Sequence, residues 1–197
     1  MLLKDKLKNW RLVLGSGSPR RKELLAYFDI PFTVDDSSNT PEIINHALQL
    51  SAVAPDLSLQ KSRGFHRELE PDEILITADT IVICKDQILG KPKDNGDARR
   101  MLHMISGCTH QVSTGVTIRT VSKQLTFCAV SRVTFRELTN QEIDYYIENY
   151  KPFDKAGAYG IQEWIGSVGV TGIEGSFYNV MGLPVQMLHD RLLAFDL

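Results

Sequence analysis

Residues 73–84 read EILITADTIVIC, an almost unbroken run of aliphatic and β-branched side chains with one aspartate, Asp79, near its middle. A run of this kind predicts a strand, and because it is apolar on both faces it predicts a strand in the centre of a sheet. An aspartate between Ile76 and Ile81 is costly to bury unless a cation, a metal or several donors meet it. Asp79 is therefore either a structural carboxylate that bonds local backbone, or a metal ligand or general base at a strand kink.

The segment upstream pairs a strand with a helix start. Residues 11–16 predict a short buried strand that continues into SGSPRR, residues 16–21. Ser18 is a good N-cap and Pro19 suits the first helical position. Free N–H groups at a helix start bind anions, and Arg20 and Arg21 add donors suited to phosphate oxygens. The alternative is a solvent-facing basic turn.

The same junction also fits part of a dinucleotide-binding fingerprint. Gly15 and Gly17 follow a strand and open a helix, and Asp35 or Asp36 lies about 20 residues further on, as that fingerprint requires. However, Arg20 occupies the position where the fingerprint needs its third glycine. The dinucleotide interpretation is therefore the weaker one.

The remaining chain predicts a mixed order of elements, and not a strict strand–helix alternation. Expected strands are 31–34, 88–89, 111–119 and 124–135; expected helices are 42–65 (interrupted at Pro55), 94–106, 139–150 with a capping box, and one starting at Pro184. Residues 152–182 are glycine-rich and predict a loop-dominated segment. We expect one α/β domain over residues 1–197, with a mixed twisted sheet flanked by helices.

Two further segments carry groups suited to a nucleotide. Gly90-Lys91-Pro92-Lys93 lacks the residues of a Walker A loop, so Lys91 either lies in a surface turn or caps a triphosphate. Residues 155–162, KAGAYGIQ, are small enough for close backbone approach to a ligand. The Gln162 amide can read a base edge. A merely flexible loop is the alternative for this segment.

Composition excludes several classes of protein. Hydrophobic residues make up 43% of the chain and charged residues 23%, and the net charge of −2 provides no basic field for nucleic acid or an anionic membrane. The three cysteines stand far apart, which argues against a zinc site or disulfide framework and favours a reducing compartment. With no signal-peptide or membrane-spanning pattern, we expect a cytoplasmic protein. The five histidines show no metal-binding spacing; of these, His110 is expected to bond backbone.

Taken in order, six segments resemble the Maf family of nucleotide pyrophosphatases. They are LGSGSPRRKELL (14–25), ITADTIVI (76–83), LGKPKD (89–94), MLHMISGCTHQVSTGV (101–116), KAGAYGIQ (155–162) and GSFYNVMGLP (175–184). The resemblance implies a fold with two lobes around a central cleft, like that of inosine-triphosphate pyrophosphatases. It also implies hydrolysis of a nucleoside triphosphate to the monophosphate and pyrophosphate, with Mg or Mn as cofactor, by a homodimer.

The resemblance also implies roles for individual residues. Ser16, Arg20 and Arg21 would surround the phosphates, Lys91 would neutralise the phosphate chain, and Asp79 would act as metal ligand or as the base that orients water. The octapeptide ending at Gln162 is similar to the subgroup that prefers dTTP and UTP.

The sequence departs from the family pattern between residues 36 and 62. Counting without gaps, Asn39-Thr40-Pro41-Glu42 occupies an acidic motif and leaves only Glu42 as a metal ligand. Leu57–Ser62 occupies a lysine-containing helix motif and leaves Lys61, which would join Arg20, Arg21 and Lys91 in binding the triphosphate. A nucleotide-binding regulator of cell division or septum formation, with little catalysis, is the alternative function. Carboxylates beside a polyphosphate favour the enzyme, since a pure binder gains nothing from them without a metal.

Overall fold

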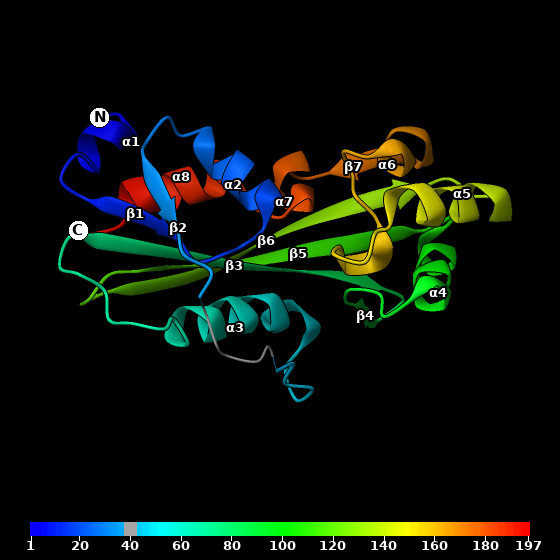
Figure 1. Ribbon diagram of the computed structural model, residues 1–197, viewed down its shortest axis with the longest axis horizontal. Helices are drawn as coiled ribbons and strands as arrows, with labels where there is room; N and C mark the ends of the chain where they lie inside the picture. The colour runs from blue at the N-terminus through cyan, green and yellow to red at the C-terminus, as the bar shows by residue number, and fades with distance from the viewer. Residues whose placement is uncertain (38–42) are drawn as a thin grey trace. The chain divides into compact units, whose positions relative to one another are not determined.

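The computed structural model describes residues 1–37 and 43–197, and it has an α/β fold built on a seven-stranded mixed sheet (Figure 1). The order is β2-β1-β3-β5-β6-β7, with β4 paired to β3. The strands are β1 (Arg11–Leu14), β2 (Phe32–Val34), β3 (Glu73–Cys84), β4 (Gln87–Leu89), β5 (Thr109–Arg119), β6 (Gln124–Phe135) and β7 (Val170–Glu174). The expected fold class, a mixed sheet flanked by helices, is confirmed.

Strands β2, β1 and β3 pair in parallel, and the apolar residues of β1 and β3 are buried. β1 pairs in parallel with β2 on one side and β3 on the other, so Leu12 lies beside both Phe32 and Ile74. Leu12 and Ile74 are at most 1% exposed. Parallel strands buried on both faces require the continuous apolar runs that residues 12–14 and 74–76 provide.

The chain divides into two compact units, and the first comprises Met1–Asp79, Thr114–Ala129 and Gly182–Leu197. Its helices are α1 (Leu3–Lys6), α2 (Pro19–Ala26), α3 (Leu50–Arg63) and α8 (Val185–Ala194). In Figure 1, α1, α2 and α8 lie on one face of the sheet and α3 lies on the other. The Lys6 ammonium donates to the carbonyls of Leu193 and Phe195 and so fastens α1 to the end of α8.

The second unit comprises Thr80–Ser113 and Val130–Met181. It contains α4 (Asn95–Ile105), α5 (Asn140–Tyr150), the 3₁₀ turn η1 (Ala156–Ala158), α6 (Trp164–Gly169) and α7 (Phe177–Met181). β3 turns into β4 through Lys85 and Asp86, which both have positive φ, as a two-residue hairpin turn requires.

Three expectations about secondary structure were wrong. The helix expected from residue 42 begins only at Leu50, because the Asn45 side chain accepts a hydrogen bond from the Ala47 N–H at 3.0 Å and closes a local turn. That helix also continues through Pro55. The segment 152–182, expected as loop, contains α6, the edge strand β7 and α7.

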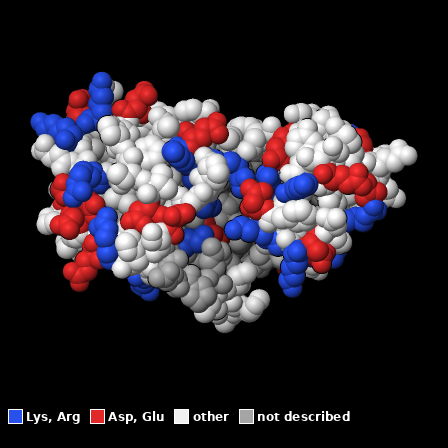
Figure 2. Space-filling view, in the orientation of Figure 1, with Lys and Arg blue, Asp and Glu red and all other residues white. Residues whose placement is uncertain are grey.

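The surface carries both signs of charge. On the face shown in Figure 2, Lys and Arg side chains are interspersed with Asp and Glu side chains, in keeping with the small net charge. Among the residues that the structure describes, no helix is long and apolar enough to cross a membrane.

Candidate active site

The loop between β1 and α2 carries the first group of predicted site residues. Ser18 caps α2: its side chain accepts from the Arg21 backbone N–H at 3.5 Å, and Pro19 takes the first helical position. The first N–H groups of a helix have no partner within the helix, and they carry the positive end of its dipole. The loop therefore ends in an anion-binding helix start.

The Arg21 side chain is held in position beside this loop by hydrogen bonds. Its Nε donates to the Gly182 carbonyl at 2.8 Å, and one terminal nitrogen donates to the Ser16 hydroxyl at 3.2 Å. The Ser18 backbone N–H also points to the Ser16 hydroxyl, at 3.4 Å. The structure thus brings two of the predicted phosphate-binding residues, Ser16 and Arg21, into direct contact.

Gly15 brings this loop against β3. The Gly15 N–H donates to the Ile76 carbonyl at 2.9 Å, and a Cβ added at Gly15 would lie 2.8 Å from the Thr77 methyl group. Only glycine allows such a close approach of backbone to a neighbouring side chain. The loop therefore lies beside β3 two residues before Asp79.

Asp79 is paired with Lys61, and the pair is positioned by a hydrogen bond between their elements. The Thr77 hydroxyl donates to the Ser58 carbonyl at 2.7 Å, which fastens α3 to β3. Lys61 follows Ser58 by three residues on the helix and Asp79 follows Thr77 by two on the strand, so both point to the same side. The Lys61 ammonium donates to the Asp79 carboxylate, and the Asp79 side chain is only 11% exposed. The predicted cation for the buried aspartate is therefore a lysine.

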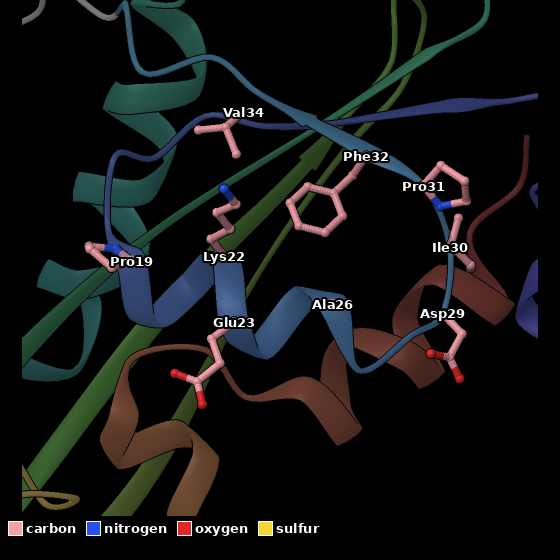
Figure 3. A pocket seen from close by; sticks show the side chains of 9 residues that line it. All are labelled: Pro19, Lys22, Glu23, Ala26, Asp29, Ile30, Pro31, Phe32 and Val34. Atoms are coloured by element: carbon pink, nitrogen blue, oxygen red, sulfur yellow. The ribbon is translucent and has the colours of Figure 1, made fainter.

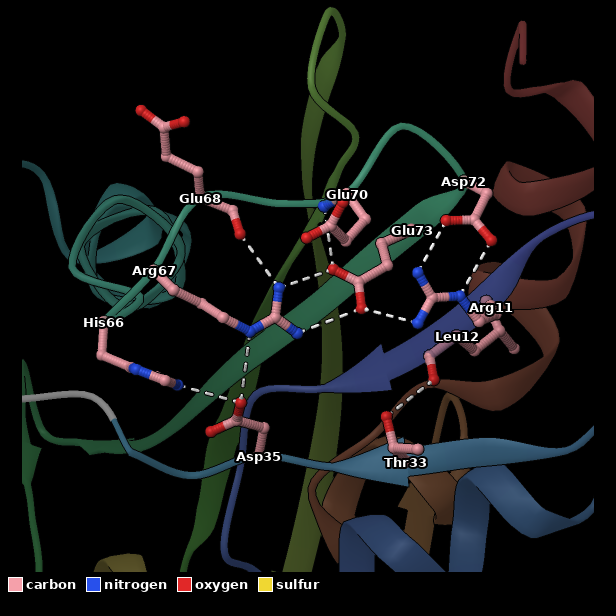
Figure 4. Close-up of polar contacts among 10 residues, drawn as sticks. All are labelled: Arg11, Leu12, Thr33, Asp35, His66, Arg67, Glu68, Glu70, Asp72 and Glu73. Carbon is pink, nitrogen blue, oxygen red and sulfur yellow. Dashed lines mark hydrogen bonds and ion pairs between the residues drawn. The ribbon is translucent and has the colours of Figure 1, made fainter.

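The acidic segment after β2 is anchored by the network in Figure 4. His66 Nε2 lies 3.0 Å from the Asp35 carboxylate, and this hydrogen bond is the main cause that lowers the pKa of Asp35. Arg67 lies 3.9 Å from Asp35 and 2.7 Å from the buried Glu73 carboxylate. Asp36 lies against Gly17, where an added Cβ would be 2.5 Å from its carboxylate oxygen. The predicted metal ligand Glu42 lies outside the described residues.

Lys91 and Gln162 belong to the second unit, on two segments joined by a backbone hydrogen bond. The Gly157 N–H donates to the Gly90 carbonyl at 3.0 Å, next to Lys91. Gly157 has a φ of +71° and no room for a Cβ against Val82, so a glycine is required there. Lys91 and Gln162 are both exposed to solvent.

Two buried polar contacts of this unit were not anticipated. Lys155 is 8% exposed, and its ammonium lies 3.0 Å from Glu163 and 2.7 Å from Asp154. His110 Nε2 lies 2.8 Å from the Tyr159 hydroxyl, so the expectation that His110 bonds backbone was wrong. Burial lowers the pKa of His110 to about 4, which keeps the ring neutral at physiological pH. No sequence pattern marks these contacts, because His110 and Tyr159 are 49 residues apart and Lys155 meets Glu163 only once the chain has turned back through η1.

A separate groove lies between α2 and β2, with a volume of about 900 Å³ (Figure 3). It is lined mostly by apolar side chains, among them Ala26, Ile30, Phe32 and Val34. None of the predicted site residues lines it.

The carboxylates of the site suit a hard divalent cation. Magnesium sites commonly use one or two carboxylates, with water and substrate phosphates completing the shell. Asp79 is a buried carboxylate beside an anion-binding loop, which fits that donor set. Across residues 1–37 and 43–197, no group of three or more His, Cys, Asp or Glu side chains is arranged to hold a metal by itself.

Comparison with known proteins gives consistent matches over the whole chain. A family model described as Maf-like protein matches residues 11–195. A dTTP/UTP pyrophosphatase of Phocaeicola vulgatus is 48% identical over 188 residues, which cover 95% of this chain and 97% of the relative. A dTTP/UTP pyrophosphatase of Porphyromonas gingivalis is 48% identical over 193 residues, covering 97% of each chain. Among solved structures, a HAM1 protein from Coxiella burnetii aligns with a TM-score of 0.50 at 12% identity, over 94% of this chain and 100% of that one, which shows a shared fold alone.

Proposed function

This chain belongs to the family of Maf-like proteins, and on that premise we propose that it hydrolyses dTTP and UTP, or modified pyrimidine analogues, to the monophosphate and pyrophosphate. The observation that carries the proposal is the buried Asp79 carboxylate, paired with Lys61 beside an anion-binding helix start. A binding site for polyphosphate needs cations. A carboxylate among them has a purpose when it accepts a proton or holds a metal.

The phosphate chain is bound by the cations of the β1–α2 loop and by Lys91. Arg21, already oriented by Ser16 and Gly182, offers a preorganised guanidinium that loses little conformational entropy on binding. Arg20 and the α2 N-terminus add donors in the same loop, and Lys91 neutralises charge further along the triphosphate. Fixed donors of this kind stabilise the charge that develops during phosphoryl transfer.

Asp79 accepts the proton from the attacking water. The water oxygen bonds to the α-phosphorus, the bond from that phosphorus to the bridging oxygen breaks, and pyrophosphate leaves. Lys61 balances the charge of the carboxylate and orients it. Asp79 and Glu42 would hold a divalent cation, Mg²⁺ or Mn²⁺, which supplies positive charge beside the phosphate oxygens.

Gln162 selects the base. Its amide offers one donor and one acceptor, which matches the alternating donor and acceptor edge of uracil and thymine. We also infer that the enzyme works as a homodimer in the cytoplasm, removing unwanted nucleotides from the pool. The three free cysteines agree with a reducing compartment.

Pyrophosphate release from a panel of nucleoside triphosphates tests the function. With Mg²⁺ present we expect dTTP and UTP to give the monophosphate and pyrophosphate, and we expect chelation of the metal to stop the reaction. Release of inorganic phosphate and a diphosphate would contradict cleavage at the α-phosphorus. Tight nucleotide binding without any hydrolysis would favour the regulator over the enzyme.

A further inference from the structure

Gln162 lies in a four-residue turn that is closed by its own backbone. The Glu163 N–H donates to the Gly160 carbonyl at 3.0 Å, so residues 161 and 162 form the tip of the turn. Ile161 is 7% exposed and points inward, whereas Gln162 is exposed. The turn therefore exposes the Gln162 amide to solvent while the side chain of Ile161 beside it is buried.

A single hydroxyl group binds both ends of this turn. The Tyr146 hydroxyl accepts a hydrogen bond from the Gly160 N–H at 3.0 Å and donates one to the Glu163 carboxylate. Burial, and then the hydrogen bond to Glu163, raise the pKa of Tyr146, so the hydroxyl keeps its proton and acts as donor. Tyr146 is itself 0% exposed on α5. The turn is thus tied to a rigid helix.

The second oxygen of the Glu163 carboxylate is also occupied. The Lys155 ammonium lies 3.0 Å from it, and Lys155 is 8% exposed. Burying such a pair gives little net stability, because both charges lose their hydration. The pair does fix the position of the Glu163 carboxylate, which packs against Gly160. A Cβ added at Gly160 would lie 2.8 Å from the carboxylate carbon.

Helix α6, which follows the turn, packs closely against the turn's backbone. A Cβ added at Gly166 in α6 would lie 2.0 Å from the Ile161 carbonyl oxygen. The backbone of the turn is therefore enclosed between α6 and the Tyr146 hydroxyl. The tip can move only if one of these contacts breaks.

We propose that Tyr146 and Glu163 are positioning residues that fix the turn carrying Gln162 and thereby set the preference for uracil-like over cytosine-like bases. The inference rests on the base-selecting role of Gln162 in the proposed function. Thymine and uracil differ from cytosine by exchanged donors and acceptors on one edge. An amide on a mobile turn can adjust to either edge, whereas an amide on a fixed turn discriminates.

The test is a double-mutant cycle between Tyr146→Phe and Gln162→Ala. The first substitution removes one oxygen and keeps the buried ring. We expect it to lower the dTMP over dCMP binding preference, and the dTTP over dCTP ratio of kcat/KM, by about tenfold, the effect of one hydrogen bond to a charged partner. The loss should fall on dTTP and not on dCTP, because an amide on a loosened turn can adjust to the cytosine edge. Combined with Gln162→Ala, Tyr146→Phe should cause no further loss of preference, since both act through the same amide.

Tyr150→Phe is the matched control, because its ring stacks on Tyr146 with centroids 5.1 Å apart and it is a 36% exposed residue at the end of α5, outside residues 160–163. It should leave the preference unchanged. Should Tyr146→Phe fail to fold, Glu163→Gln weakens the same contacts and is expected to lower the same ratios. Unchanged ratios in the folded variant, or losses that add to those of Gln162→Ala, would overturn the positioning role. Binding of dTMP and dCMP needs no turnover, so an inactive wild-type protein would refute the proposed function and still decide this inference.

Discussion

At the scale of single residues, the Asp79–Lys61 pair is the feature on which the proposed chemistry depends. The two side chains are 11% and 18% exposed, so little water remains to solvate either charge. A buried ion pair adds little to stability when compared with apolar residues of the same size, but breaking it leaves one uncompensated charge. Such a pair is better explained by a function of the carboxylate than by the needs of the fold.

Replacing Lys61 with methionine should therefore destabilise the protein, because Asp79 keeps its charge and loses its partner. We expect a loss of about 2 kcal/mol in the free energy of unfolding. This is less than the cost of breaking a fully buried ion pair, because both side chains keep some exposure to solvent. Urea denaturation measures it. The double variant with Asp79→Asn should recover most of the loss, and a Lys61→Met protein as stable as the wild type would contradict the coupling.

Residue patterning alone marks one side of this pair and not the other, and Lys61 was expected at the site only from the resemblance to the Maf family. Asp79 stands out because a charged residue interrupts an apolar strand. Lys61 lies in a weakly patterned helix, and nothing local shows that it faces the sheet. Lys155 was missed for a similar reason: a lysine beside small residues suggests a surface loop, and its partner Glu163 is brought to it by the fold.

At the scale of elements, the position of Lys61 depends on how closely α3 approaches the sheet. A Cβ added at Gly115 of β5 would lie 2.1 Å from the Ala54 carbonyl oxygen and 2.3 Å from the Pro55 nitrogen. Both atoms are backbone and cannot swing away. The glycine therefore sets the distance between α3 and the strands beneath it.

Gly115→Ala should push α3 outward and destabilise the protein by about 3 kcal/mol or more, as overpacking of a rigid contact does. Thermal and urea unfolding measure the change. Gly172→Ala in β7 is the control, since its added methyl meets only one atom, at 4.0 Å, and should be nearly neutral. Equal stability of the two variants would show that α3 adjusts freely.

The capping box of α5 contributes to the stability of the fold, and the sign of its pH dependence follows from the pKa of Glu142. The hydrogen bond from Arg136 is the largest cause that lowers the pKa of Glu142, from 4.5 to about 2. Because the folded pKa is depressed, Glu142 stabilises the fold above pH 4.5 and loses that contribution as the pH falls toward 2. Glu142→Gln should therefore be less stable than wild type at pH 7, with the difference shrinking below pH 4.5. A difference independent of pH in urea unfolding would refute this assignment.

The elements that sequence predicted well have strong local signals. Thr139 marks the start of α5. Gly107, which adopts a positive φ, marks the end of α4. The elements it missed, α6, β7 and α7, are short, and residues 171–174 of β7 are exposed, so no apolar periodicity marks them. The formation of β7 depends on pairing with β6, which is a tertiary contact.

At the scale of the whole molecule, the fold class followed from the apolar strand and the mixed element order, but the strand order did not. β3 lies between β1 and β5 through contacts of long sequence separation, which periodicity does not encode. The expected single domain over residues 1–197 and the homodimer stay predictions; light scattering measures the latter. Arg21 belongs to the first unit and Gln162 to the second, and their roles in phosphate binding and base selection are likewise proposals.

The central claim is that Asp79 is the proton acceptor in nucleoside triphosphate hydrolysis. The most direct measurement is kcat/KM for dTTP with Mg²⁺ in Asp79→Asn, alongside urea unfolding of the same variant. We predict a loss of about a thousandfold, within the range expected for removing a general base, in a protein that still unfolds cooperatively. A folded Asp79→Asn enzyme with nearly full turnover of dTTP would contradict the account.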